Sequence, residues 1–334
     1  MQELSSLKYY AMRVAAFLLP LVVLAAGLEA GTRRVGTLHE VRARTLQAPN
    51  EAELLVTGNS HETVGIICRE LGRPCFKLAA GSQSVFYDRA LLRRFGHNFP
   101  KVRAVLIGIS FYSFKYAMES DEGWRQYEYW HAYGIDGERE PLPFSDARRY
   151  SRVMTAGTRT VLGWAAAGFP RALPAAAADA RGDVDVGAFV QRDKSRAALE
   201  RRIAQHHRRL RPELVAEARA AVDAMVDWAK QRGALPVMVV TPVSPGYAER
   251  IEPGELAFVH GELARQQGRG AIVADYLADS RFADDLFYDF DHLNARGAQL
   301  FTELLRVEVL QPALGKLAEG TSNHVFETAA RRVE

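Results

Sequence analysis

The sequence predicts an α/β protein of three layers, α/β/α, in which helices cover both faces of a parallel sheet of about five strands, behind an N-terminal transmembrane helix. Short, continuously apolar runs recur along the chain, helical stretches follow them, and an uncharged apolar run lies near the N-terminus. Continuous apolar runs are typical of strands buried on both faces. Alternation of such strands with helices is typical of a parallel sheet.

Residues 1–30 are predicted to form a membrane anchor. After Lys8 and Arg13 comes an uncharged apolar run over 14–28. Counted from Tyr9, it has the length of roughly 20 residues that crosses a hydrocarbon core. The basic residues before the run predict a cytoplasmic N-terminus and a domain on the periplasmic or extracellular side of the cell membrane. A cleaved signal peptide is the alternative, and we favour the anchor because the run ends in a poor cleavage site.

The rest of the chain divides into a polar spacer at 31–50, an α/β domain at 51–310 and a C-terminal tail at 311–334. The expected strands are 53–57, 75–79, 102–109, 235–241 and 271–274, and the expected helices are 61–71, 84–95, 256–267 and 294–310. An insertion at about 112–193 interrupts this alternation, and one long helix over 194–231 is expected to lead back into the sheet. The aromatic residues at 124–133 could stack on sugar rings, although a role in the core or at the membrane interface is favoured.

The net charge and the cysteine content limit the functions that are compatible with the sequence. The formal net charge is only +3, and the arginines are spread among acidic and alanine residues. This pattern predicts no nucleic-acid partner. Cys68 and Cys75 flank a short turn, and both a disulfide and two buried free thiols are compatible with that spacing.

The first candidate site is the segment 54–61, which reads LLVTGNSH. A serine that follows a buried strand and a glycine turn, directly before a helix, has an accessible hydroxyl. Backbone N–H groups and a helix N-terminus lie nearby to hold an oxyanion. Ser60 is therefore a candidate nucleophile. The alternative is that Ser60 only caps the helix.

The second candidate site is the segment 287–294, which reads FYDFDHLN. A carboxylate three residues before a histidine can accept the imidazole Nδ1–H and leave Nε2 to take a proton from a serine. We expect Asp289 to orient His292 in this way and Asp291 to point away. A turn that merely caps the last helix is the alternative. His206 and His207 are adjacent on a helix and do not face one point, so we expect no metal site and no cofactor.

Together the two segments resemble the SGNH-hydrolase superfamily, whose fold is flavodoxin-like. The closer resemblance is to membrane-anchored proteins that O-acetylate alginate or act in D-alanylation of teichoic acid. The resemblance covers about 50–115 and 230–308, with Gly58-Asn59-Ser60-His61 as the first block and Asp289-x-x-His292 as the last. It implies Ser60, Asp289 and His292 as catalytic residues.

The resemblance also implies an oxyanion hole. Gly81 is the expected glycine donor, but Ser110 stands where the family has an asparagine. A hydroxyl reaches less far than an amide, and loss of one oxyanion donor typically costs about 10²–10³ in rate. We therefore expect a specialised transferase more than a broad hydrolase. Asn59, His61 and Gln83 are expected substrate-binding residues, with a structural role as the alternative for His61.

The function expected from these features is transfer of an acyl group, of which acetyl is the favoured one, to or from an envelope polysaccharide or exopolysaccharide through an acyl-enzyme on Ser60. A membrane-bound O-acyltransferase is the partner that the resemblance implies. One alternative is a non-catalytic assembly or glycan-binding component, which the Ser110 departure favours. Another is a lipid esterase at the bilayer surface.

Overall fold

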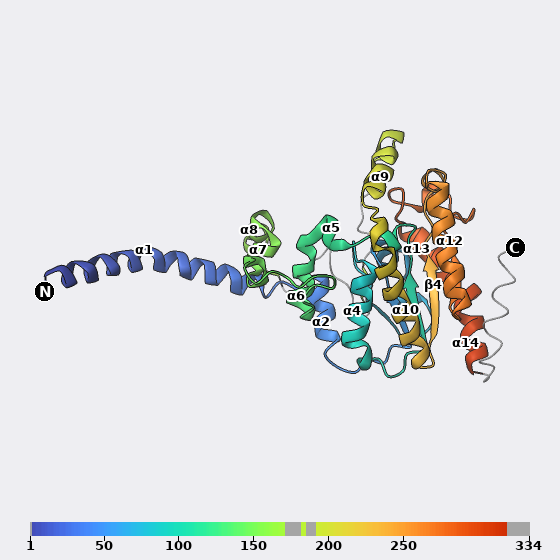
Figure 1. The fold of residues 1–334 in the computed structure, drawn as a ribbon, viewed down its shortest axis with the longest axis horizontal. Coiled ribbons are helices and arrows are strands. Elements are labelled where there is room, and N and C mark those ends of the chain that lie inside the picture. The colour runs from blue at the N-terminus through green and yellow to red at the C-terminus, as the bar shows by residue number, and fades with distance from the viewer. Residues whose placement is uncertain (1, 171–181, 185–191, 319–334) are drawn as a thin grey trace.

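Five parallel strands form the sheet at the centre of the computed structural model, which describes residues 2–170, 182–184 and 192–318 (Figure 1). The strands are β1 (Leu54–Thr57), β2 (Cys75–Lys77), β3 (Ala104–Gly108), β4 (Leu235–Val240) and β5 (Ile272–Asp275). They lie in the order β2-β1-β3-β4-β5. Because β1 lies between β2 and β3 in the sheet, its carboxyl end is flanked by the ends of those two strands. The predicted α/β class and the parallel five-stranded sheet are confirmed.

Alternate residues of the strands enter two separate hydrophobic cores. Leu55 and Val105 belong to the core that contains the buried side chains of α4 (Val85–Phe95), α10 (Val215–Gln231) and α12 (Pro253–Gly268). Leu54 and Leu106 belong to the other core, with α13 (Ala295–Leu304) and α14 (Gln311–Ala318). Successive strand residues point to opposite faces of a sheet, so helices cover this sheet on both faces.

Two helices differ from the prediction. The single helix expected over 194–231 is wrong: α9 (Arg196–Arg208) ends before Pro212, and a 3₁₀ turn at Pro212–Leu214 precedes α10. Proline lacks an N–H and disfavours the α conformation in the residue before it. The expected helix 61–71 is also shorter, because α3 (Ser60–Gly65) ends early and a 3₁₀ turn follows at Cys68–Glu70.

The N-terminal helix α1 (Gln2–Thr32) extends away from the rest of the chain (Figure 1). Its segment Lys8–Thr32 is long and apolar enough to cross a membrane. The segment expected to be a spacer contains α2 (Leu38–Thr45), which begins with a reciprocal cap between Thr37 and Glu40. Within the segment expected to be a tail, Leu314 of α14 is buried.

The insertion carries α5 (Met118–Glu122), α6 (Gln126–Tyr133), α7 (Arg152–Ala156) and α8 (Thr158–Ala166). Tyr129 of α6 is buried and packs on Tyr87 of α4 at a ring-centroid distance of 4.4 Å. Tyr127 and Tyr133 are buried as well. These three tyrosines therefore contribute to the interior, which leaves Trp124 as the exposed aromatic residue of the group.

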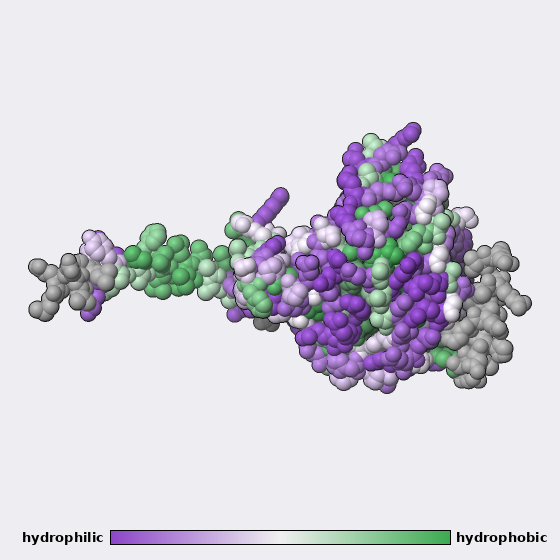
Figure 2. Space-filling view, viewed as in Figure 1, coloured by the Kyte–Doolittle hydropathy of each residue, from purple (hydrophilic) through white to green (hydrophobic). Residues whose placement is uncertain are grey.

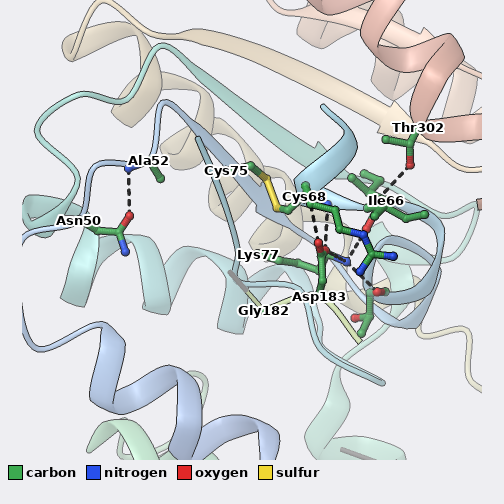
Figure 3. The surroundings of a disulfide bond; sticks show 12 residues. Asn50, Ala52, Ile66, Cys68, Cys75, Lys77, Gly182, Asp183 and Thr302 are labelled. Atoms are coloured by element: carbon green, nitrogen blue, oxygen red, sulfur yellow. Dashed lines mark hydrogen bonds and ion pairs between the residues drawn. A yellow bond between two sulfur atoms is a disulfide. The ribbon is translucent and has the colours of Figure 1, made fainter. Parts of the chain in front are cut away.

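Cys68 and Cys75 are joined by a disulfide beside β2 (Figure 3). Asp183, from the insertion, lies next to it: one carboxylate oxygen accepts the Cys68 N–H at 2.8 Å and is 3.0 Å from the Lys77 ammonium. Lys77 also donates to the Thr63 carbonyl at 2.9 Å. The disulfide and this buried ion pair together fix the chain that leaves α3 and returns to the edge strand.

Candidate active site

Ser60 lies where β1 ends and α3 begins. Gly58 has a φ of +129°, which an L side chain rarely adopts, and it turns the chain out of the strand. Asn59 is the helix cap: its Oδ1 accepts the His61 N–H at 2.9 Å, and Glu62 accepts the Asn59 N–H at 2.8 Å. Because Asn59 and Glu62 form the cap, the hydroxyl of Ser60 does not serve that purpose.

The turn depends on a second glycine. The Glu62 side chain lies beneath the ends of β1 and β3. A Cβ atom added at Gly58 would lie 2.3 Å from Glu62 Oε2, and one added at Gly108 would lie 2.2 Å from Glu62 Cδ. Such distances are far inside van der Waals contact. The glycines at these two strand ends therefore make room for the carboxyl group that holds the Ser60 turn.

The Ser60 hydroxyl, His292 and Asp289 form one hydrogen-bonded series. His292 Nε2 is 2.8 Å from Ser60 Oγ, and His292 Nδ1 is 3.0 and 3.1 Å from the two oxygens of Asp289. Ser60 is half-buried, whereas the other two are buried. An imidazole held in this way by a carboxylate has Nε2 placed to accept the hydroxyl proton.

The loop that carries Asp289 is itself tightly bonded. Asp289 Oδ1 accepts the backbone N–H of His292 at 2.9 Å, and the Tyr288 N–H donates to the His292 carbonyl at 3.1 Å. Desolvation favours the neutral acid, but the hydrogen bond and charge of His292 hold the pKa of Asp289 below its ordinary value. Asp289 is therefore an ionised acceptor for the imidazole N–H.

Asp291 points inward, which is a correction to the expectation that it points away. It is fully buried, and Arg202 of α9 binds both of its oxygens at 2.8 and 2.7 Å. Although burial raises the pKa of Asp291, the nearby His292, His61 and Arg202 hold it well below its usual range. A carboxylate oxygen of Asp291 is 3.7 Å from His292 Nδ1, farther than Asp289. Asp291 thus connects α9 to the loop that carries Asp289 and His292, which we call the histidine loop.

His61 and Ser110 lie behind the Ser60 turn. Burial lowers the pKa of His61, so its neutral ring donates from Nε2 to Asp291 at 3.1 Å. Asn59 Nδ2 donates to Ser110 Oγ at 3.0 Å, and Ser110 Oγ is 3.0 Å from His61 Nδ1. The Ser110 hydroxyl proton is therefore directed at His61. This geometry does not match the expected oxyanion role of Ser110 or the expected substrate contact of His61.

Gln83 is also bonded within the interior, and this geometry does not match its expected substrate contact. It is buried, donates to Asp88 at 2.5 Å and accepts from the Tyr129 hydroxyl at 2.5 Å. Gly81 lies in the turn after β2, partly exposed, with open space around its Cα. Next to it, Ser82 reaches the same cavity as Ser60.

A small cavity of about 90 Å³ opens at Ser60. Its remaining lining comes from polar and aromatic side chains, namely Asn59, Ser82, Tyr112, Tyr116, Glu122, Arg202, Gln205, His206 and Arg209. Beyond Arg202 and Gln205 a broad groove of about 1,030 Å³ follows α9 and reaches Asp289. The volume of the Ser60 cavity is well below the roughly 300–1,000 Å³ of typical small-molecule pockets.

One group of side chains among the described residues has the spacing of metal ligands. Donor atoms of His61, Asp291 and His292 lie within 4.8 Å of one another. However, the Arg202 guanidinium already binds both oxygens of Asp291 and places a positive charge there. A second cation at this position would be repelled, so the donor set fits an ion-pair network better than a metal.

Two buried carboxyl groups lie beneath the Ser60 turn. Burial raises the pKa of Glu62 to about 8 and that of Asp88, which accepts the Gly58 N–H at 2.7 Å, to about 7. Each is therefore protonated in the folded chain at a pH where the unfolded chain has lost that proton. Buried His39 and His206 have pKa values lowered to about 3, so they are neutral in the folded chain. The unfolded histidines lose their protons around pH 6.5, which raises the free energy of unfolding as the pH rises through that value, and this effect fades above it.

We expect the free energy of unfolding to fall as the pH rises from 6.5 to 8, and Glu62→Gln to reduce this fall. In this window the folded state binds the Glu62 proton and the unfolded state does not, which removes up to about 1.4 kcal/mol per pH unit. Urea denaturation of the full chain in detergent measures it. An unchanged slope in the variant would show that Glu62 is ionised throughout.

The chain matches no protein-family model, and no curated protein has significant similarity to it.

Proposed function

We propose that this chain is a membrane-anchored serine acyltransferase with an SGNH-type three-layer fold. The observation that carries the proposal is the hydrogen-bonded series Ser60–His292–Asp289. It joins a serine at the carboxyl end of one strand to an acid–base pair some 230 residues later, at the same edge of the sheet. Sites of open parallel sheets lie at this edge.

In the proposed reaction, His292 Nε2 accepts the Ser60 proton as Oγ attacks the carbonyl carbon of an acyl donor. The tetrahedral intermediate collapses, the bond to the donor oxygen breaks, and His292 returns its proton to that leaving oxygen. A hydroxyl of the acceptor then gives its proton to His292 and attacks the acyl-enzyme. Ser60 Oγ is released and takes the proton back, so the residues end unchanged.

The oxyanion would need donors other than the Ser110 hydroxyl. An amide nitrogen has two protons, and Asn59 Nδ2 uses one for Ser110 while the residue lines the Ser60 cavity. We assign the second Asn59 N–H to the oxyanion, together with the backbone N–H groups of Ser60 and Gly81 that the family resemblance implies. In this assignment Ser110 positions Asn59 instead of contacting substrate.

The cavities support a short acyl group and a large acceptor. The space at Ser60 can hold an acetyl-sized group but not a fatty acyl chain, whereas the groove along α9 can hold several sugar residues. An apolar helix long enough to span a membrane and a disulfide fit a domain held outside the cytoplasm. The proposed acceptor is therefore an envelope polysaccharide or exopolysaccharide, and the proposed acyl supplier is a membrane-bound O-acyltransferase.

A non-catalytic glycan-binding component is the second candidate. The engagement of Ser110 by Asn59 and His61 favours it, because the position where the family has an oxyanion donor is occupied by a scaffold hydrogen bond. A protein of this kind would keep the groove along α9 and would not react at Ser60.

Reaction of the full chain, in detergent, with a fluorophosphonate probe separates the two candidates. We expect covalent labelling of the wild type and none of Ser60→Ala. Ser82→Gly is the matched control, because it removes a hydroxyl from the same cavity at a residue whose φ of +58° suits glycine. Absence of labelling in the wild type, with polymer acylation in cells unaffected by Ser60→Ala but lost on deletion of the gene, would establish the non-catalytic role.

A further inference from the structure

The end of α1 is bonded to the insertion by a set of part-buried and exposed hydrogen bonds. Glu29, one turn before the end of the helix, accepts from the Ser151 hydroxyl at 2.9 Å and from the Arg152 N–H at 3.1 Å. It also accepts from Arg33 at 2.8 Å, and Arg33 in turn donates to the Tyr150 carbonyl. The side chain of Glu29 thus caps α7 and fixes that helix to the end of α1.

Close packing reinforces this joint. The ring of Phe169 lies 2.6 Å from the position that a Cβ atom would take at Gly31, so only glycine permits the contact. A few residues later the Gly36 N–H donates to the Pro170 carbonyl. The segment 150–170 therefore has a defined position relative to α1, and Figure 1 shows α7 and α8 beside the point where α1 meets the domain.

Exposed apolar side chains gather next to the joint. Beyond α1, six large apolar side chains of the described residues are exposed, and four of them lie within 144–162. These four, which we call the 144–162 surface, are Phe144, Tyr150, Met154 and Leu162. Their exposed fractions are 56–75%. Figure 2 shows apolar residues along α1 and apolar residues interspersed with hydrophilic ones over α7 and α8, whereas the face over α4 and α10 is largely hydrophilic.

We propose that the 144–162 surface lies in the interfacial layer of the bilayer that α1 crosses, and so sets the orientation of the Ser60 domain relative to the membrane. The inference rests on the proposed anchoring by α1. A span of about 20 residues that begins at Tyr9 ends near Leu28, one residue before the Glu29 joint. The surface is therefore held at the level of the lipid headgroups.

The composition of the surface fits lipid as its occupant. Exposed apolar side chains alternate with Arg148 and Arg159, and Arg33 and Arg34 follow the end of α1. Interfacial elements bury an apolar face about 5–10 Å into the boundary between headgroups and acyl chains, with arginines placed toward the phosphates. Continuity with the membrane-spanning helix separates this occupant from a soluble protein, which would not need to bind at the exit point of α1.

Brominated lipids test the proposal on the full chain in protein-free vesicles of phosphatidylglycerol and phosphatidylethanolamine. The only two cysteines form the disulfide, so a single added cysteine can carry an environment-sensitive NBD label. Leu162→Cys reports on the 144–162 surface and Leu19→Cys on α1. Val307→Cys is the control: this exposed residue directly precedes α14, which Figure 1 shows at the side of the domain away from α1.

We expect bromine near the headgroup end of the acyl chains to quench the label at Leu162→Cys, bromine near the bilayer centre to quench the label at Leu19→Cys, and neither to quench Val307→Cys. Quenching at Leu19→Cys without quenching at Leu162→Cys would overturn the inference and leave the anchor intact. That outcome would assign the surface to a protein partner or to water. Absence of quenching at Leu19→Cys would overturn the anchoring itself and the inference with it.

Discussion

Replacement of Asp289 by asparagine is expected to slow the Ser60-dependent reaction with a fluorophosphonate or an activated acetyl ester by about 10⁴-fold. Asp289 accepts the Nδ1–H of His292, and its pKa is held below the ordinary value, so it supplies a negative charge to the ring. An asparagine amide can donate to Nδ1 and stabilise the other tautomer. Nε2 would then carry a proton and could not accept one from Ser60.

The rate of covalent labelling measures this effect. Asp193→Asn is a suitable control. The Asp193 carboxylate lines the neighbouring groove, and in the described part of the chain it bonds to Ser195 and not to His292. Asp291→Asn provides the decisive comparison. If Asp291→Asn abolished labelling in a folded protein while Asp289→Asn retained it, the carboxylate that orients His292 would be Asp291.

Local sequence patterns were sufficient to predict that Ser60, Asp289 and His292 lie close together. Ser60 lies two residues after Gly58 at the end of a buried strand, and Asp289 lies three residues before His292 in the loop that precedes α13. The carboxyl ends of parallel strands share one edge of a sheet, so the topology supplied the remaining proximity. The chemistry of the three residues stays a prediction. The parallel sheet was predictable because several of the strands, such as β3 and β4, are nearly continuous apolar runs that alternate with helices.

The polar network behind Ser60 could not be predicted in this way. Arg202 meets Asp291 across 89 residues, and Ser110 meets Asn59 across 51. Nothing in the sequence near these residues distinguishes a buried partner from a solvated one, since only the packing of α9 against the histidine loop creates the contact. Gln83 is an expected substrate-binding residue, but its amide turns inward to Asp88 and Tyr129.

Arg202→Met is expected to lower the free energy of unfolding by about 3–5 kcal/mol. Asp291 is completely buried, and the guanidinium binds both of its oxygens. Among the described residues, removal of the guanidinium leaves the buried carboxylate with His61 as its one side-chain hydrogen-bond donor, and the ionised form then loses most of its stabilisation. Urea denaturation of the full chain in detergent measures the change.

A double-mutant cycle with Asp291→Asn separates this ion pair from packing. Arg202 has a side-chain exposure of 23%, so after Asp291→Asn its charge can reach water, and that variant should cost less than Arg202→Met. The double variant should cost less than the sum of the two, because it leaves no buried charge unpaired.

Arg201→Met is the matched control on the same helix. Arg201 is 70% exposed and 3.8 Å from Asp193, so its replacement should change the free energy of unfolding by no more than about 1 kcal/mol. Equal costs for Arg202→Met and Arg201→Met would mean that Asp291 is compensated by His61 and His292 alone. Arg202 would then be a wall of the Ser60 cavity and not a support of the histidine loop.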